Sequence, residues 1–275
     1  MPRPRPSWSM GSNDREILRD LDQLYGQRVP QWVRFALRET CNFLLPASCA
    51  VCGRADDRLC PTCRGAVRRQ LCLPPLPDSQ SRYLELPALA GQIPVAACGV
   101  YGNELARAIL SYKDHQRYFL KELFSPYLAA ALNASLVPQS SARRTLAVPM
   151  PTSLKAIARR GYRPVEAMLQ SAERLGLLDA GLELSPVLHY RMGQVFSGAQ
   201  KSKSGSDRRG QHAQLIAEIP RVRQQPILLV DDVMTTGSTL QNAAITCNNA
   251  GYDVLGGVVL ALTRPPGDDR GGQLR

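Results

Sequence analysis

The chain has 275 residues, of which 44% are hydrophobic and 21% are charged, and this balance is typical of a folded globular protein. The net charge of +11 favours polyanions or phosphorylated molecules as ligands. No stretch reaches the roughly 18 apolar residues of a membrane span, and the opening segment MPRPRPSWSMGSNDRE lacks the apolar part of an export signal. We therefore expect a cytoplasmic protein whose eight cysteines bind metal or pack in a core rather than form disulfide bonds.

Shifts in composition divide the chain into five regions. Residues 1–40 predict a disordered tail and an N-terminal helix, and residues 41–73 predict a small zinc-ribbon-like module rich in cysteine. The Pro/Ser/Gln-rich residues 74–93 predict a linker. Residues 94–265 are expected to form the main domain, and residues 266–275 a second disordered tail.

Four cysteines form two Cys-x-x-Cys pairs. Cys49 and Cys52 precede Cys60 and Cys63, and seven residues separate the pairs. Each pair can direct two thiolates at one point, so the four predict a closed tetrahedral site for a structural Zn²⁺ ion. A reduced cysteine-rich turn or a redox pair is the alternative interpretation. The arginines of this module leave contact with nucleic acid, contact with protein and simple solvation open. The other four cysteines are interpreted as packed residues: Cys41, Cys72, Cys98 and Cys247.

Strands alternate with helices in the main domain. Strand patterns occur at residues 94–102, 145–151, 186–190, 227–230 and 254–262. Helical patterns occur at residues 103–132, in two segments parted near Lys113–Gln116, and at residues 164–176 and 239–250. This alternation predicts an α/β fold with a mostly parallel sheet flanked by helices.

The segment ILLVDDVMTTGSTL, residues 227–240, carries the strongest functional signal. Its apolar run predicts a central strand that ends at Asp231 and Asp232, on the sheet edge where open α/β folds bind ligands. The Thr/Gly/Ser loop that follows leads into a helix, so its amides and hydroxyls suit a phosphate group. Two acids beside such a loop suit the hydroxyls of a phosphorylated sugar, or a divalent cation. An ordinary strand and capped helix is the alternative.

The same segment resembles the motif of type I phosphoribosyltransferases that binds 5-phosphoribosyl 1-pyrophosphate (PRPP). The resemblance implies a type I phosphoribosyltransferase-like sheet, in which the catalytic residues Asp231 and Asp232 approach the ribose hydroxyls and the following loop holds the 5-phosphate. The implied substrate-binding residues of this loop are Met234, Thr235, Thr236, Gly237, Ser238 and Thr239. Mg²⁺ is the expected companion of PRPP, because it can steady the pyrophosphate charge.

The order of motifs over residues 41–263 is similar to that of the ComF family of proteins associated with DNA uptake. The similarity rests on the four cysteines, on VYGNELARAILSYKDHQRYFLKEL, on VPMP with RRGY downstream, and on the PRPP motif. It implies single-stranded DNA and a DNA-translocating helicase as partners. It also implies a pyrophosphate loop and further ligand-binding residues: Pro149, Met150, Pro151, Thr152, Lys113, Arg160, Lys201 and Arg208. The chain departs from the family where Arg163 replaces the usual Asn before Pro164, although Pro still suits the first helical turn.

Three functions remain open from the sequence. Thr235 stands where purine-salvage members of the wider superfamily carry an acid that acts as a base. The basic segment Ser197–Gly210 has the composition of a mobile lid or of a solvated loop. The chain is therefore expected to be a ComF-like PRPP-binding protein that serves DNA uptake or nucleic-acid handling, an active phosphoribosyltransferase of nucleotide metabolism with an unknown acceptor, or a non-catalytic PRPP-sensing regulator.

Overall fold

The computed structural model describes residues 48–73, 82–86, 91–136, 144–191 and 215–263. The two expected tails, the N-terminal helix, Cys41 and the basic segment Ser197–Gly210 lie outside the described residues. The described chain falls into two compact units: residues 48–49 and 54–58 belong to one, and residues 50–53 and 59–263 belong to the other. Each helix and strand named below belongs to the second unit.

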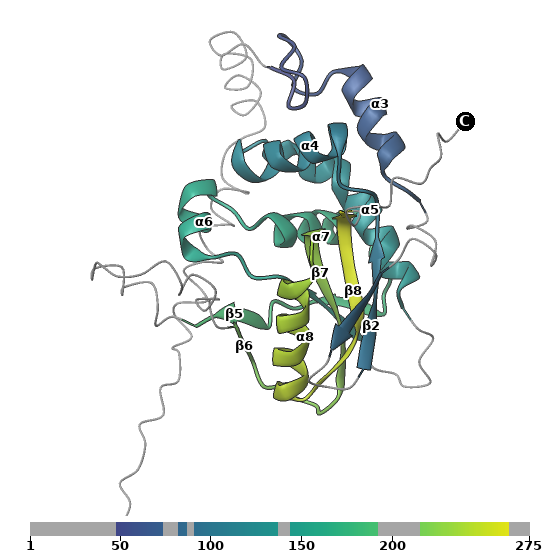
Figure 1. Ribbon diagram of the computed structural model, residues 1–275, viewed down its shortest axis with the longest axis vertical. Coiled ribbons are helices and arrows are strands. Elements are labelled where there is room, and N and C mark those ends of the chain that lie inside the picture. The colour runs from purple at the N-terminus through teal and green to yellow at the C-terminus, as the bar shows by residue number, and fades with distance from the viewer. Residues whose placement is uncertain (1–47, 74–81, 87–90, 137–143, 192–214, 264–275) are drawn as a thin grey trace, which may run out of the picture. The chain divides into compact units, whose positions relative to one another are not determined.

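A six-stranded sheet forms the centre of this unit (Figure 1). Its strand order is β1-β2-β8-β7-β3-β4, and every neighbouring pair is parallel except the antiparallel pair of β1 and β2. A separate antiparallel pair joins β5 to β6. The strands are β1 (Arg82–Leu86), β2 (Gly91–Ala97), β3 (Thr145–Pro149), β4 (Leu182–Leu184), β5 (Leu188–Tyr190), β6 (Leu215–Ala217), β7 (Gln225–Met234) and β8 (Tyr252–Leu262).

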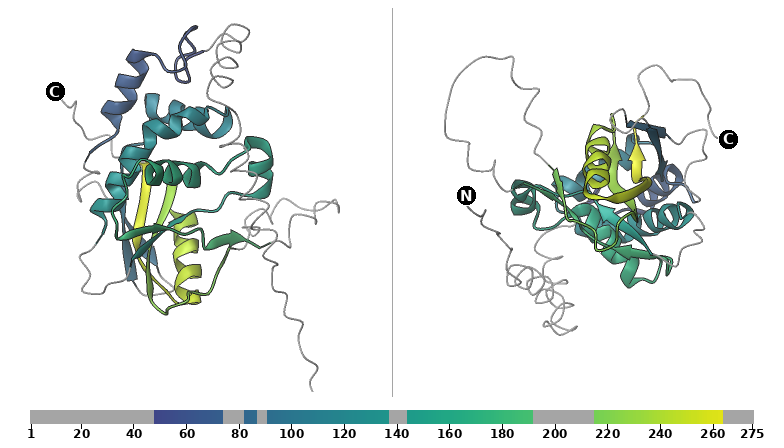
Figure 2. Two further views of the ribbon diagram at one scale, coloured as in Figure 1. Left: turned by 180° about the vertical axis from the view of Figure 1, so that it is seen from behind. Right: turned by 90° about the horizontal axis from the view of Figure 1, so that it is seen from below.

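Helices cover both faces of the sheet. In the views of Figures 1 and 2, α5 and α7 lie on one face, where they contact each other and the strands, and α8 lies on the opposite face against β7 and β8. The helices are α3 (Pro61–Gln70), α4 (Asn103–Asp114), α5 (Lys121–Ala134), α6 (Leu154–Arg160), α7 (Pro164–Arg174) and α8 (Ser238–Ala250), with the short 3₁₀ helix η2 (Tyr118–Leu120) before α5. This arrangement confirms the predicted α/β class with a mostly parallel sheet.

The central strand β7 explains why the sheet is buried. Four consecutive apolar residues of β7 are each at most 1% exposed, so buried side chains project from both faces of this strand: Ile227, Leu228, Leu229 and Val230. A strand of that kind is stable only where helices remove both faces from water. The apolar run therefore explains why β7 is an inner strand, which lies between β8 and β3.

Several short elements were not predicted. Within the stretch expected as a linker, Arg82–Leu86 forms β1, in which Leu84 and Leu86 are buried while Tyr83 and Glu85 are exposed. This alternation is typical of a strand with one face on the core. In contrast, α6 buries none of its seven residues, so it leaves no apolar pattern to recognise. The strands β4 and β6 have three residues each, which is too short for a periodic signal.

No helix in the part of the chain that the structure describes is long and apolar enough to cross a membrane.

Candidate functional site

The two acids directly follow the apolar run of β7 and lie three and two residues before its last residue, Met234. Asp232 is 6% exposed, whereas Asp231 is partly accessible and accepts a hydrogen bond from the Asp232 amide at 2.8 Å. The Lys113 Nζ atom, from the last turn of α4, lies 2.9 Å from Asp232 Oδ1. An ion pair is thus present where a buried carboxylate would otherwise lack a counter-charge. The pairing joins residues 119 positions apart in the sequence.

The surroundings of Asp231 favour the neutral form of its carboxyl group. Desolvation, followed by the negative charge of Asp232, raises the pKa of Asp231 from 3.8 to about 8. Desolvation and the charge of Asp231 also raise the pKa of Tyr190, so the end of β5 lies within electrostatic reach of this acid. A carboxyl group with a raised pKa beside an ion-paired neighbour is a frequent feature of functional sites.

The loop after β7 presents hydroxyl groups at the start of α8. Thr235, Thr236, Ser238 and Thr239 are exposed, and the Thr236 Oγ1 and Ser238 Oγ atoms lie 3.1 Å apart. The amide of Thr263, after β8, donates to the Met234 carbonyl at 2.9 Å and fixes the start of the loop.

Two features of this loop restrict which atoms can meet a ligand. Met234 is 4% exposed and packs in the core, so only its backbone faces the loop. Gly237 has φ +80°, and a Cβ atom there would lie 2.6 Å from Leu84 Cδ1. Glycine is therefore required at the turn between the last β7 residue and α8, both for conformation and for space.

The expected pyrophosphate loop begins beside the acids. Pro149 pairs with Val230 in the sheet, and the Met150 amide donates to the Val230 carbonyl at 2.8 Å. Pro149 and Met150 are buried, while Pro151 and Thr152 are partly accessible. The parallel strands β3 and β7 thus bring both predicted ligand loops to one edge of the sheet.

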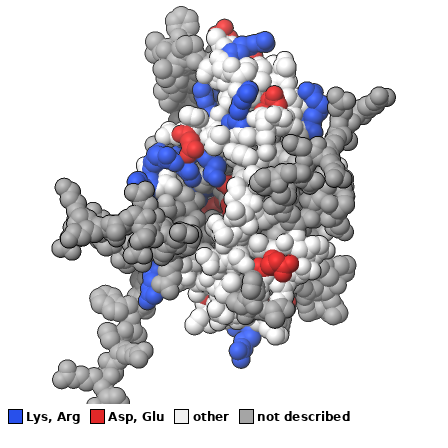
Figure 3. All heavy atoms as spheres, viewed as in Figure 1, with Lys and Arg blue, Asp and Glu red and all other residues white. Residues whose placement is uncertain are grey.

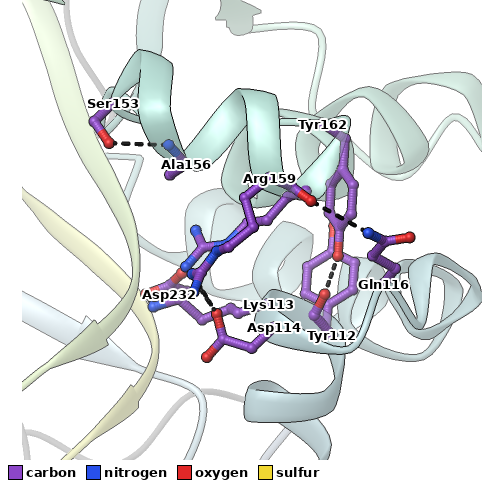
Figure 4. A network of polar contacts seen from close by, with 10 residues as sticks. Tyr112, Lys113, Asp114, Gln116, Ser153, Ala156, Arg159, Tyr162 and Asp232 are labelled. Atoms are coloured by element: carbon purple, nitrogen blue, oxygen red, sulfur yellow. Dashed lines mark hydrogen bonds and ion pairs between the residues drawn. The ribbon is translucent and has the colours of Figure 1, made fainter.

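Three basic side chains gather at this edge from α4 and α6. Besides Lys113, Arg159 and Arg160 end α6, and their Nη2 atoms lie 2.8 Å and 3.1 Å from one oxygen, Oδ1, of Asp114. Figure 4 shows the Lys113–Asp232 pair and the Arg159–Asp114 pair. In the space-filling view, acidic atoms lie recessed in a hollow with Lys and Arg atoms gathered above it (Figure 3). The arrangement is suited to an anion that carries more than one negative charge.

A tyrosine network holds α4 against α6 and α7. The Tyr112 hydroxyl donates to the Pro164 carbonyl at 2.8 Å, and the Tyr162 hydroxyl donates to the Tyr112 carbonyl (Figure 4). Gln116 Nε2 donates to the Arg159 carbonyl at 3.2 Å. These contacts fix the end of α4, which carries Lys113, relative to the RRGY segment.

Several residues near the site were missed from the sequence, namely Asp114, Gln116, Tyr112, Tyr162 and Tyr190. Tyr162 belongs to the RRGY motif and Asp114 follows Lys113 directly, so both lie in or next to residues that the sequence singled out. The contact of Tyr162 with Tyr112, and that of Asp114 with the arginines of α6, have no local sequence signal. The predicted ligand-binding residues Lys201 and Arg208 lie outside the described residues.

The four predicted metal-binding cysteines come together. The sulfur atoms of Cys49, Cys52, Cys60 and Cys63 all lie within 4.8 Å of one another, and those of Cys52 and Cys60 are 3.8 Å apart. A tetrahedral zinc site with Zn–S bonds of about 2.3 Å requires sulfur atoms about 3.8 Å apart, so the cluster is compatible with zinc. Cys60 precedes α3, and Cys63 lies in its first turn. Cys98 and Cys247 are fully buried, as expected of packed residues, and Cys72 is partly buried.

Comparison with known proteins places part of this site in a recognised domain. Residues 175–270 match the family model described as a phosphoribosyl transferase domain, a range that includes β7, both acids and the loop before α8. Lys113, Arg160 and the four cysteines precede the matched range. These findings support a phosphoribosyltransferase-type domain in the chain.

Among curated proteins nothing matches the chain. A solved structure titled "Structure of the allosteric regulatory enzyme of purine biosynthesis" is 17% identical with a TM-score of 0.32. The match covers 55% of this chain and 26% of that chain, so the present protein spans about a quarter of the length of that enzyme.

Proposed function

We propose that the protein binds PRPP, or a related phosphoribosyl ligand, at the carboxyl edge of β3 and β7. The observation that carries the proposal is the meeting of two ligand loops at this edge, since Met150 bonds to Val230, the residue directly before Asp231. The match to a phosphoribosyl transferase domain over residues 175–270 supports it.

The roles of the residues follow from the shape of the ligand. Asp231 and Asp232 would accept hydrogen bonds from the ribose hydroxyls, and the hydroxyls of Thr235, Thr236 and Ser238 would donate to the 5-phosphate. In the ligand-free structure, Asp232 Oδ1 contacts the Lys113 ammonium group. On binding, this ion pair would either break or persist while Asp232 also accepts a hydrogen bond from the ribose.

The pyrophosphate group would lie toward Pro149–Thr152 and the basic residues of α6. Arg160 is the strongest candidate for a direct contact, since only 14% of its side chain is exposed, against 63% for Arg159. Bound Mg²⁺ would supply positive charge to the pyrophosphate oxygens.

A calorimetric titration tests this assignment. PRPP with Mg²⁺ should bind the wild-type protein, and the Asp231→Asn/Asp232→Asn variant should bind it at least about tenfold more weakly, because hydrogen bonds to charged groups are lost. The matched control is Glu183→Gln/Asp253→Asn, which removes two exposed carboxylates from the opposite end of the strands. Absence of PRPP binding by the wild-type protein would overturn the proposal.

Whether the bound ligand is turned over is a separate point. Thr235, at the position of the superfamily acid, has no group that takes up a proton at neutral pH. This observation favours binding without transfer, and hence a sensing role, over an active phosphoribosyltransferase. An assay of pyrophosphate release with a panel of nucleobases distinguishes the two functions, because only an enzyme releases pyrophosphate in an acceptor-dependent manner.

We also propose that the four-cysteine cluster holds one structural Zn²⁺ ion. Four thiolates complete the coordination of zinc and stabilise a segment too small to hold a core of its own. Metal analysis should find one zinc per chain in the wild-type protein and in Cys72→Ser, which alters a cysteine outside the cluster. Cys49→Ser/Cys52→Ser should lose the metal and unfold at a lower temperature. Equal zinc content in all three proteins would contradict the assignment.

Finally, we propose a ComF-like role in DNA uptake or nucleic-acid handling, with single-stranded DNA and a DNA-translocating helicase as partners. The support is the similarity of motif order over residues 41–263 and the net charge of +11. A cytoplasmic location is part of the same proposal. Binding of a single-stranded oligonucleotide, measured by fluorescence anisotropy, tests the role directly.

A further inference from the structure

Asp114 forms ion pairs with both basic residues at the end of α6. Its Oδ1 atom accepts from both Arg159 and Arg160, at 2.8 Å and 3.1 Å, while the neighbouring Lys113 pairs with Asp232. The last two residues of α4 thus contact opposite charges on two different elements. The sequence motifs predicted no role for Asp114.

The contact leaves Arg160 incompletely satisfied. Its Nε atom is buried and has no hydrogen-bond partner among the described residues, although Nη2 of the same guanidinium contacts Asp114. Nε and Nη2 lie on one edge of the guanidinium group, and this edge can donate two parallel hydrogen bonds to two oxygens of a carboxylate or phosphate. A single oxygen that is shared with Arg159 cannot fill that edge.

A buried donor without a partner is costly, and a larger anion would relieve the cost. A diphosphate presents several oxygens on two adjacent centres, so it could meet both Nε and Nη2 of Arg160 and still reach Arg159. A carboxylate held at the end of α4 has only two oxygens, of which one already serves both arginines.

We propose that Asp114 is an internal anion that an incoming pyrophosphate group replaces on Arg159 and Arg160. The inference rests on the proposed function and adds a competing group to the same site. A ligand must displace Asp114 before it gains the arginines, so Asp114 weakens binding most for an anion that takes both arginines. Asp114 therefore lowers the affinity for the pyrophosphate end of PRPP more than the affinity for a single phosphate.

The test is a calorimetric titration of the full chain with inorganic pyrophosphate, with and without Mg²⁺. Asp114→Asn removes the charge, and Asp114→Ala also removes the acceptor. Each should bind pyrophosphate about three- to tenfold more tightly than the wild-type protein, since partly exposed ion pairs are weak competitors. Asp253→Asn and Asp253→Ala are the matched controls, because Asp253 is exposed at the other end of β8. Thermal unfolding of each variant verifies that it is folded.

Two further measurements locate the gain. Inorganic phosphate should gain less affinity than pyrophosphate in the Asp114 variants, because it cannot span both arginines. Adding Arg160→Gln to Asp114→Asn should abolish the gain. A gain that persists without Arg160 would mean that the anion binds elsewhere, and this outcome would overturn the proposal.

The outcomes separate this inference from the proposed function. If the wild-type protein binds pyrophosphate or PRPP but the Asp114 variants bind no more tightly than the Asp253 controls, Asp114 is not a competitor and only this inference fails. If neither ligand binds any of the proteins, the phosphoribosyl site itself fails. Binding by the Asp114 variants alone would support a complete block by the internal anion.

Discussion

Asp231 shows how the site alters an ordinary carboxylic acid. Its pKa of about 8 arises from desolvation and from the charge of Asp232, so the folded protein binds a proton that the unfolded chain, with a pKa near 3.8, has released. The folded state holds more protons between these two values, and the free energy of unfolding must fall as the pH rises through this window. Because the two acids interact, the titration belongs to the pair.

Replacing Asp231 should therefore stabilise the ligand-free protein in a pH-dependent manner. Asp231→Asn cannot ionise, so its melting temperature should exceed that of the wild type by at least about 2 °C at pH 8 and by less at pH 5. Thermal unfolding without Mg²⁺ or phosphate measures the difference, and Asp253→Asn controls for the loss of one exposed charge. A difference in melting temperature between the variant and the wild type that is the same at pH 8 and pH 5 would contradict the raised pKa.

At the scale of elements, the junction of β7 and α8 combines a required conformation with a tight contact. Gly237→Ala introduces a left-handed residue, which costs about 1–2 kcal/mol, and places Cβ 2.6 Å from Leu84 of β1. Gly176→Ala is the matched control, since Gly176 has φ +65° and a Cβ atom there would meet no other atom within 4 Å, so only the conformational cost applies.

The expected result is a larger loss at Gly237. Urea denaturation should show that Gly237→Ala loses about 1 kcal/mol more than Gly176→Ala, because the buried Leu84 side chain must move. PRPP binding should weaken in Gly237→Ala alone. Equal losses of stability in the two variants would mean that β1 yields without cost.

Long buried elements were predictable from the sequence, and paired short ones were not. The apolar run of β7, and Pro164 and Gly176 at the two ends of α7, are local signals, so the position and type of these elements follow from a few consecutive residues. By contrast, α6 buries nothing, and β1 lies in a Pro/Ser-rich context that suggests a linker. Asp231, Asp232 and the Thr/Gly/Ser loop were visible as a motif. The contacts of Lys113 and Asp114 depend on the packing of α4 against β7 and α6, which no local pattern specifies.

For the whole molecule, the net charge of +11 makes a prediction about nucleic acid. If the proposed role is correct, the affinity for a single-stranded oligonucleotide should fall at least about tenfold between about 50 and 200 mM salt, because bound counterions are released from the phosphates. Fluorescence anisotropy at several salt concentrations gives the slope. Cys49→Ser/Cys52→Ser, compared with Cys72→Ser, shows whether the cysteine module contributes. An affinity that is unchanged by salt would exclude a charge-driven interaction.

The antiparallel strand β1 has a consequence for shortened forms of the protein. Because β1 pairs along one side of β2, it keeps the backbone amides and carbonyls of that side from other chains. A fragment that begins at Gly91 would retain most of the sheet but would present β2 as a bare strand edge beside the uncovered side chains that Leu84 and Leu86 normally contact. Such a fragment is expected to self-associate through edge-to-edge strand pairing, so its solubility, rather than its ligand affinity, would be the first property to fail.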